Sequence, residues 1–238
     1  MAFHCGPRQK SIVTDGLVLS LDAGNTNSYP GTGTTWSDLS GNGNNGTLTN
    51  GPTFNSANQG SIVFDGTNDY ITTPDSTSLR PTSFSIDTWF KPTSFGVYNN
   101  IVAKPVNGPA WSSPYLSYMV RISANGTLLE CSTSTGGTYR ALNVSYTFLV
   151  NTIYNISFTF DSSTGAAITY LNGSILSSTT HTAGAISYAS APVLIGASYG
   201  GIPVGEFFAG NIYNVQIYNK VLSQIEVTQN YDALRNRF

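Results

Sequence analysis

The sequence is 238 residues long with a mass of 25.3 kDa, a size at which all-β proteins commonly form a single domain. Its formal net charge is −2 and its pI is about 5.5, so there is no basic excess to neutralise a run of phosphates, and nucleic acid is excluded as an expected partner. Charged residues make up 9% of the chain, compared with about 25% in an average soluble domain. Ser, Thr, Asn and Gly replace them, a composition typical of the surface of a cell or a particle.

The N-terminal segment differs from the rest of the chain. Residues 1–15 are too few to form a core, and we predict that they form an arm that anchors the domain to a neighbouring protein. Residues 16–238 are predicted to form the domain itself. Asp15 and Gly16 interrupt the first residues before an apolar run of signal-peptide length develops, and no stretch of the chain approaches the length of a membrane span.

A run of turn-forming residues spans positions 23–54. Asn-Gly steps at positions 42, 45 and 50 accept positive φ angles at little cost, so the run predicts successive tight turns over the edge of a sheet. Its apolar anchors are Trp36 and Leu39.

Residues 61–92 contain two strand patterns, at 62–65 and 84–90, with a short polar arm between them. The second pattern alternates between the two sides of a pleat. One side carries Phe84, Ile86, Thr88 and Phe90, and the other carries Ser85, Asp87, Trp89 and Lys91. This alternation predicts a half-buried strand.

Residues 93–115 are predicted to be a long connection, and loops of this length in compact domains are often functional. The alternation in residues 116–131, with Asn125-Gly126 between its two halves, predicts a hairpin. A strand is predicted at 154–160, and a second hairpin at 168–176.

The C-terminal part combines strands with one helix signal. Core strands are predicted at 192–197 and 207–219. Ser223 and Glu226 have the S-x-x-E spacing of a capping box, and Val227, Tyr231 and Leu234 follow at helical spacing. We therefore predict one short C-terminal helix.

Four ordered motifs carry a resemblance to a known family. They are D-L-S-G-N-G-N-N-G-T-L at 38–48, F-D-G-x-x-D-Y-I at 64–71, F-S-I-x-x-W-F-K-P at 84–92 and F-A-G-N-I-Y-N-V-Q-I-Y-N-K-V-L-S at 208–223. Together they resemble the laminin-G-like domains of the concanavalin A-like lectin and glucanase superfamily. This resemblance implies an all-β fold, a two-sheet antiparallel jelly-roll sandwich. The run L-D-A-G-N-x-x-S-Y-P-G-x-G-T-T-W at 21–36 looks like the form found in structural proteins of tailed bacteriophages.

The superfamily includes glycoside hydrolases, which need two carboxyl groups across the glycosidic bond. The chain has only three glutamates, Glu130, Glu206 and Glu226, and none has another acid two or four residues away. Asp65 and Asp69 are four residues apart, but their place beside a turn indicates that they hold the loop through backbone hydrogen bonds. We therefore predict that the protein is not an enzyme.

Other reactive groups are sparse. Cys5 and Cys131 lie far apart and form no C-x-x-C pair, so two free thiols are expected. Neither of the two histidines stands in a Ser-His-Asp arrangement.

Calcium is the one cofactor for which the sequence offers an argument. Hard cations bind carboxylate, amide and carbonyl oxygens, and the loop after the first turns supplies Asp38, Asn42 and Asn44 close together. Asp22 could approach from a neighbouring strand. The alternative is that the same side chains cap the turns of their own loop. Both interpretations stay open from the sequence.

Aromatic residues in the predicted loops are the candidate ligand contacts. Sugars offer apolar ring faces and many hydroxyls, and Trp111, Tyr115, Tyr98 and Tyr199 stand beside amide and hydroxyl groups. The same aromatic side chains would suit packing against a neighbouring subunit, because such residues are enriched at protein interfaces.

These observations favour a non-enzymatic structural or decoration module of a phage virion, displayed on the capsid or tail, with adhesive glycan binding as an additional role. Its expected partners are other virion proteins, bound through the N-terminal arm, host cell-surface glycans, and further copies of the chain. A virion protein is assembled in the host cytoplasm and needs no signal peptide. The alternative is a cell-surface lectin or adhesin that binds host polysaccharide, and a glycoside hydrolase is a third, less favoured hypothesis.

Overall fold

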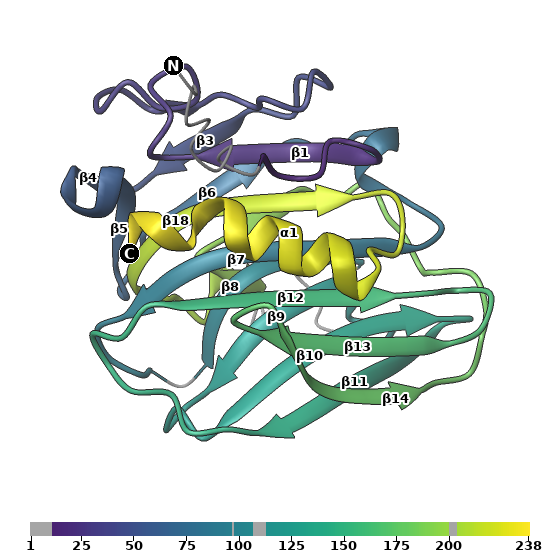
Figure 1. Cartoon of the computed structure of the whole chain (residues 1–238). Helices are drawn as coiled ribbons and strands as arrows, with labels where there is room; N and C mark the ends of the chain where they lie inside the picture. Colours follow the sequence, from purple (N-terminus) through teal and green to yellow (C-terminus); the bar gives the residue numbers. More distant parts are fainter. Residues whose placement is uncertain (1–10, 97, 107–112, 200–203) are drawn as a thin grey trace, which may run out of the picture.

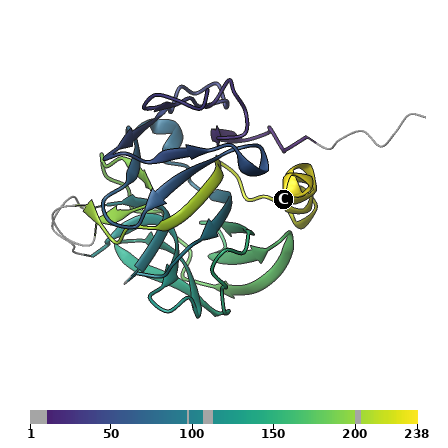
Figure 2. The ribbon, with the colours of Figure 1, turned by 90° about the vertical axis from the view of Figure 1, so that its left-hand side faces the viewer.

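The structure, a computed structural model, describes residues 11–96, 98–106, 113–199 and 204–238. Two eight-stranded antiparallel sheets pack face to face, and a short helix lies outside one of them (Figure 1). Figure 2 shows that helix end-on, beside the sandwich and not within it. This is the predicted all-β, jelly-roll-like sandwich with one short C-terminal helix.

The sheet under the helix, here called the helix-side sheet, has the strand order β14-β13-β12-β7-β18-β5-β4, and β1 also pairs with β18. Its strands are β1 (Leu17–Asp22), β4 (Thr53–Asn55), β5 (Ser61–Asp65), β7 (Phe84–Pro92), β12 (Tyr154–Phe160), β13 (Ala166–Leu171), β14 (Ser174–Thr180) and β18 (Ala209–Tyr218).

The opposite sheet, here called the far sheet, has the order β11-β10-β9-β8-β15-β6-β3-β2. Its strands are β2 (Thr35–Trp36), β3 (Gly46–Thr49), β6 (Tyr70–Thr73), β8 (Tyr98–Pro105), β9 (Leu116–Ser123), β10 (Leu128–Thr135), β11 (Thr138–Ser145) and β15 (Val193–Ile195). The remaining elements are the β16–β17 pair (Ser198–Tyr199 and Val204–Gly205), helix α1 (Gln224–Leu234) and the 3-10 turns Ala57–Gln59, Thr77–Leu79 and Arg235–Arg237.

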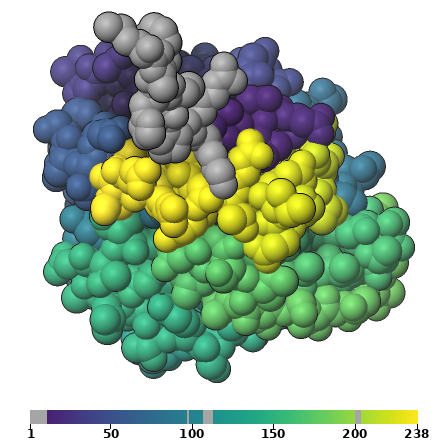
Figure 3. Space-filling model, in the orientation of Figure 1, coloured from purple at the N-terminus to yellow at the C-terminus, as the bar shows by residue number. Residues whose placement is uncertain are grey.

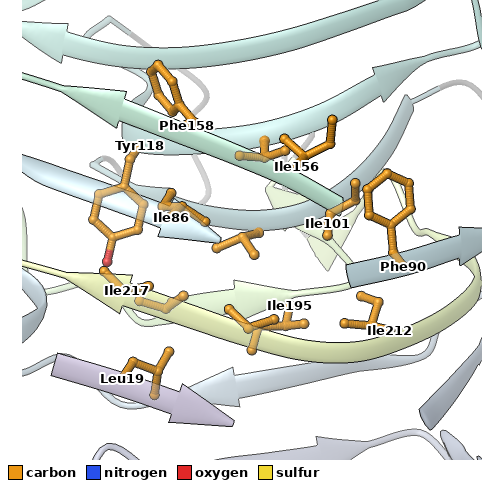
Figure 4. Packing of buried hydrophobic residues seen from close by; sticks show 14 of the residues in the cluster. Leu19, Ile86, Phe90, Ile101, Tyr118, Ile156, Phe158, Ile195, Ile212 and Ile217 are labelled. Carbon is orange, nitrogen blue, oxygen red and sulfur yellow. The ribbon is translucent and has the colours of Figure 1, made fainter. Parts of the chain in front are cut away.

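The core fills the space between the two sheets, because alternate residues of each strand point inward. Figure 4 shows side chains from both sheets meeting there: Leu19, Ile86, Phe90, Ile156, Phe158, Ile212 and Ile217 from the helix-side sheet, and Ile101, Tyr118 and Ile195 from the far sheet. The ring of Phe84 lies 5.2 Å from that of Tyr118 and 5.4 Å from that of Phe158, centroid to centroid. Each fully buried side chain of this kind contributes about 1.5–3 kcal/mol to folding.

Most predicted strands and turns are confirmed. The hairpin around Asn125-Gly126 is β9–β10, the second hairpin is β13–β14, and the capping box is present at the start of α1. The turn-rich run crosses the edge of the far sheet through β2 and β3, with Trp36 fully buried. Leu39, the other predicted anchor, is instead 39% exposed.

Two predictions about strands were wrong. Strand β7 is buried on both faces and not only on one, because α1 and the residues after it cover the side that carries Asp87 and Trp89. The predicted connection 93–115 contains strand β8, which the sequence does not reveal because β-bulges near Asn100 and Lys104 break its alternation.

Helix α1 is fixed to the sandwich by buried polar contacts as well as by apolar packing. Asn230 accepts a hydrogen bond from the backbone N–H of Val13 at 2.8 Å and donates one to the hydroxyl of Tyr218 at 2.9 Å. In Figure 3 the helix (yellow) lies across one face of the molecule, between β1 (purple) and the β13–β14 hairpin (green). Among the described residues, no helix combines the length and apolar character needed to cross a membrane.

The predicted N-terminal arm is described only from residue 11 onward. In that part Val13 is buried against the domain, and its carbonyl accepts a hydrogen bond from Tyr218 at 3.1 Å. Of the two cysteines, Cys131 is buried and free, and Cys5 lies outside the described residues.

Candidate functional site

The outer face of the far sheet carries a group of charged and aromatic side chains that are in contact with one another but are far apart in the sequence. On β9 the residues that alternate with the core-facing Tyr118 and Val120 point outward, and Arg121 is one of them. On β10 Glu130 points outward in the same way. We call the following set the Arg121 cluster: Tyr98, Asn100, Arg121, Glu130, Ser132, Tyr139 and Glu206.

Arg121 stands at the centre of this cluster and binds two carboxylates. Its Nε and Nη2 atoms donate to Oε2 of Glu130 at 3.1 and 2.9 Å, and its Nη1 donates to Oε2 of Glu206 at 3.4 Å. The guanidinium carbon lies 4.1 Å from the centre of the Tyr98 ring, within the range of a cation–π contact. The side chains of Arg121 and Glu130 are each 11% exposed, so the pair is largely removed from water.

The strand register explains why these residues meet. Arg121 lies opposite Glu130 in the β9–β10 pair, and Asn100 lies opposite Arg121 in the β8–β9 pair. Glu206 comes from the segment after β17, and Asn100 holds it by donating to its carboxylate at 2.9 Å and to its backbone carbonyl at 3.1 Å. Side chains directly opposite each other on one face of a sheet lie about 5 Å apart, close enough for these contacts.

Glu130 also accepts hydrogen bonds from hydroxyl groups. Ser132 donates to Oε1 at 3.1 Å, and the Tyr139 hydroxyl donates to the same oxygen. Burial raises the pKa of Tyr139, and the neighbouring charge of Glu130 raises it further, so this hydroxyl keeps its proton at neutral pH. Burial lowers the pKa of Arg121, but the charge of Glu130 and the hydrogen bond to it outweigh that effect, and the pKa lies above its ordinary value.

The cluster continues into an apolar group on the same face. Ala103, Leu116 and Met119 are fully buried there, and Tyr115 and Tyr139 pack against them. The rings of Tyr115 and Tyr139 lie 5.8 Å apart, edge to face. A row of side chains thus runs from Tyr98, which is 37% exposed, through the charged groups to Tyr115.

The predicted ligand contacts are placed as follows. Tyr98 and Tyr115 lie at the two ends of this row, so the structure brings both to one face. Tyr199 belongs to β16 and is paired with Val204 of β17, just before Glu206. Trp111 lies outside the described residues.

Asp38, the first predicted calcium ligand, uses both carboxylate oxygens within its own loop and the adjacent strand. Oδ1 accepts from the backbone N–H groups of Ser20 and Ser40 at 2.8 and 2.9 Å. Oδ2 accepts from the Ser40 hydroxyl at 2.7 Å and from the N–H of Asn44 at 3.0 Å. Asn44 in turn donates to the carbonyl of Val18 at 2.8 Å, which fixes the loop to β1.

The other two predicted calcium ligands also have protein partners. Asn42 donates to the carbonyl of Leu17 at 3.4 Å. Asp22 accepts from Nη1 of Arg237 at 2.9 and 3.0 Å. Over the described ranges, no three His, Cys, Asp or Glu side chains form a group suited to a metal ion. The contacts support the turn-capping interpretation, and calcium binding stays a prediction.

Asp65 and Asp69 act as predicted. Asp65 accepts from the N–H groups of Thr67 and Asn68 at 2.7 and 3.2 Å, and Asp69 accepts from the N–H of Asp65 at 3.0 Å. Both carboxylates therefore hold a turn.

Sequence reasoning missed the centre of the site. It treated the glutamates as scattered, whereas the structure places Glu130 and Glu206 on one guanidinium. The pairing of Arg121 with Glu130 could have been found, because both occupy outward positions of the predicted hairpin. No local signal connects Glu206 to them.

The chain belongs to the Laminin_G_3 family, in the concanavalin A-like lectin/glucanases superfamily, whose family model matches residues 65–228. No curated protein matches the sequence significantly.

Among solved structures, domain 4 of AbnA, a GH43 extracellular arabinanase from Geobacillus stearothermophilus in complex with arabinotriose, is 19% identical with a TM-score of 0.66, and the match covers 90% of this chain and 98% of that one. The binding domain of paraclostridial mosquitocidal protein 1 is 17% identical with a TM-score of 0.68, over 92% of this chain and 52% of that one. The binding domain of botulinum neurotoxin DC in complex with SialylT is 14% identical with a TM-score of 0.69, over 93% and 52%. The chain spans about half the length of these toxin domains, and identities this low indicate a shared fold only.

Proposed function

We propose that the domain is a non-catalytic carbohydrate-binding module whose ligand lies on the outer face of the far sheet, against the Arg121 cluster. The observation that carries this proposal is the row from Tyr98 to Tyr115, in which aromatic rings stand beside amide, hydroxyl and charged groups that are held by one another. Sugar ligands require apolar surface together with a few fixed hydrogen-bonding groups. The complex of the AbnA domain with arabinotriose supports a saccharide as the ligand class.

The contacts of the two carboxylates support a binding role over a catalytic one. A glycosidase needs one carboxylic acid that gives a proton and a second carboxylate that acts as base or nucleophile. Here Glu130 and Glu206 both accept hydrogen bonds from the same arginine, and Glu130 also accepts from Ser132 and Tyr139. Both glutamates are thus used as acceptors that position Arg121.

Calorimetric titration of the protein with soluble arabinan and a panel of other neutral polysaccharides tests the proposal. Tyr98→Ala removes the most exposed ring of the row and is expected to weaken binding about tenfold, equivalent to about 1.4 kcal/mol. The matched control is Ile225→Ala, on helix α1, where the side chain is 79% exposed and far from the site. Equal affinity of the wild type and Tyr98→Ala, or an effect of Ile225→Ala alone, would place the ligand elsewhere.

A second proposal concerns where the module is displayed. The sequence of residues 21–36 resembles the form found in phage structural proteins, and we propose that the domain decorates a phage capsid or tail through its N-terminal arm. Removing residues 2–10 keeps the contacts of Val13 with Asn230 and Tyr218, so the domain is expected to stay folded. The truncated protein is expected not to be incorporated into particles. Antibody labelling in electron micrographs measures incorporation. Normal incorporation of the truncated protein contradicts this role.

A further inference from the structure

The Arg121 cluster carries an excess of negative charge. It contains one arginine and two glutamates, which gives a formal charge of −1. All three side chains are less than one fifth exposed, so water screens their charges less than it would on an open surface. A ligand bound along the row would therefore experience this charge directly.

The cation of the cluster is already bound by the protein's own carboxylates. Proteins usually recognise carboxylate, sulfate and phosphate groups by two parallel N–H bonds from a guanidinium. In Arg121 the Nε and Nη2 donors both point to Glu130, and Nη1 points to Glu206. The Nε/Nη2 edge is therefore occupied, and an acidic group could form two parallel bonds on this edge only by displacing Glu130.

Two cations on neighbouring strands of the described chain, Lys104 and Arg140, do not lie on this face. Lys104, on β8, lies opposite the core-facing Tyr118 and binds Asp75 and the carbonyl of Ala191 in the interior. Arg140, on β11, has the same parity as the core-facing Leu142, so it lies on the other face from Tyr139. Of the stretches outside the described residues, 97, 107–112 and 200–203 contain no ionisable side chain in the sequence, whereas residues 1–10 contain His4, Arg8 and Lys10.

From this arrangement we infer that the site selects uncharged saccharides and rejects acidic ones, such as uronic-acid, sialylated or sulfated sugars. The inference rests on the proposed carbohydrate-binding function and assigns the ligand class. Neutral hydroxyls can accept or donate hydrogen bonds at the cluster without an added charge. An anionic group would instead meet two carboxylates and would lose its own hydration. Glu206 and Glu130 are thus specificity-determining residues through charge.

The experiment compares neutral polymers (arabinan, dextran, hydroxyethyl cellulose) with acidic ones (polygalacturonate, dextran sulfate, carboxymethyl cellulose) by affinity electrophoresis and titration at low salt. The wild type is expected to bind at least one neutral polymer at least tenfold more tightly than any acidic polymer. Glu206→Gln keeps an oxygen for Asn100 and Arg121 but removes one negative charge, and it is expected to narrow that difference at least fivefold. Asp15→Asn is the matched control, since it removes the same charge from a side chain that is 82% exposed and outside the site.

The outcomes separate the inference from the proposed function. Charge selection at the cluster is supported if the difference in affinity between neutral and acidic polymers becomes smaller in Glu206→Gln but not in Asp15→Asn. Equal or tighter binding of acidic polymers by the wild type, or the same response in both variants, overturns charge selection and leaves carbohydrate binding intact. Binding of no polymer in either group overturns the proposed function, and the inference with it.

Discussion

The outer faces of the two sheets each carry acidic side chains, but these side chains differ in their burial and in the charge of their partners. On the far sheet Glu130 is paired with a cation and remains near the surface. On the helix-side sheet Asp87 is fully buried, and its hydrogen-bond partners, Ser157 at 2.5 Å and Asn155 at 3.2 Å, are both neutral. The outer face of the helix-side sheet is thus buried, whereas that of the far sheet is the one to which we assign ligand binding in our proposal.

The outer face of the helix-side sheet is covered mainly by aromatic side chains. Trp89, on β7, is only 3% exposed, because the rings of Tyr231 and Phe238 stack on it at 5.3 and 4.4 Å. Phe238 also contacts Tyr213 at 4.8 Å, edge to face. The far sheet has no helix over it in the described part of the chain, and its outward residues therefore carry function in our proposal.

The largest expected loss of stability comes from removing an aromatic contact between the helix-side sheet and α1. Trp89→Ala removes the ring that joins β7 to α1 and to the residues after it, and it is expected to cost about 3–5 kcal/mol of unfolding free energy. Tyr98→Ala, the corresponding change on the far sheet, is expected to cost less than about 1 kcal/mol because its ring is 37% exposed. Urea denaturation of both variants provides the measurement. Equal losses of unfolding free energy in Trp89→Ala and Tyr98→Ala would mean that the outer faces of the two sheets contribute equally to stability.

The second expected effect is a pH dependence of folding stability that arises from Asp87, on the buried outer face of the helix-side sheet. Burial raises the pKa of Asp87 from 3.8 to about 6, while its hydrogen bonds to Ser157 and Asn155 oppose the shift. The folded protein thus holds this proton more tightly than the unfolded chain, so the contribution of Asp87 to stability is present below about pH 4 and is lost as pH rises to about 6. The loss amounts to about 3 kcal/mol at most.

Asp87→Asn is expected to remove this pH dependence while keeping an acceptor for Ser157. Thermal unfolding of wild type and variant between pH 4 and pH 7 shows it: the melting temperature of the variant relative to wild type should rise across this range. A constant difference between the two proteins would mean that Asp87 is not the responsible group.

The smallest of the three effects concerns the pair on the far sheet. Arg121→Met leaves Glu130 largely buried without its cation and is expected to cost about 2 kcal/mol at neutral pH. Adding Glu130→Gln removes the unpaired charge, so the double variant is expected to recover at least half of that loss. Equilibrium denaturation of the two single variants and the double variant gives the coupling energy. Additive losses would show that the two side chains do not depend on each other.

Local signals in the sequence predicted a large part of the fold. The period-2 alternation of residues 84–90 and 116–131, the Asn-Gly step at 125 and the capping box of Ser223 and Glu226 all depend on neighbours within a few residues. These are short-range preferences of backbone and side chain, and they survive in any tertiary context that buries one side of the strand. The family motifs then indicated how such strands are arranged into two sheets.

The sequence by itself therefore determined most of the strands and turns and the C-terminal helix, because alternation, positive-φ residues and caps act within a few residues of each other. The sandwich was implied by the family motifs. Only the tertiary structure decided which sides of the strands stay accessible. Helix α1 packs on Trp89 from a distant part of the chain, and the segment after β17 brings Glu206 to Arg121. Such contacts join residues whose separation in sequence carries no period or motif, so the position and charge of the site emerge only when the chain is folded.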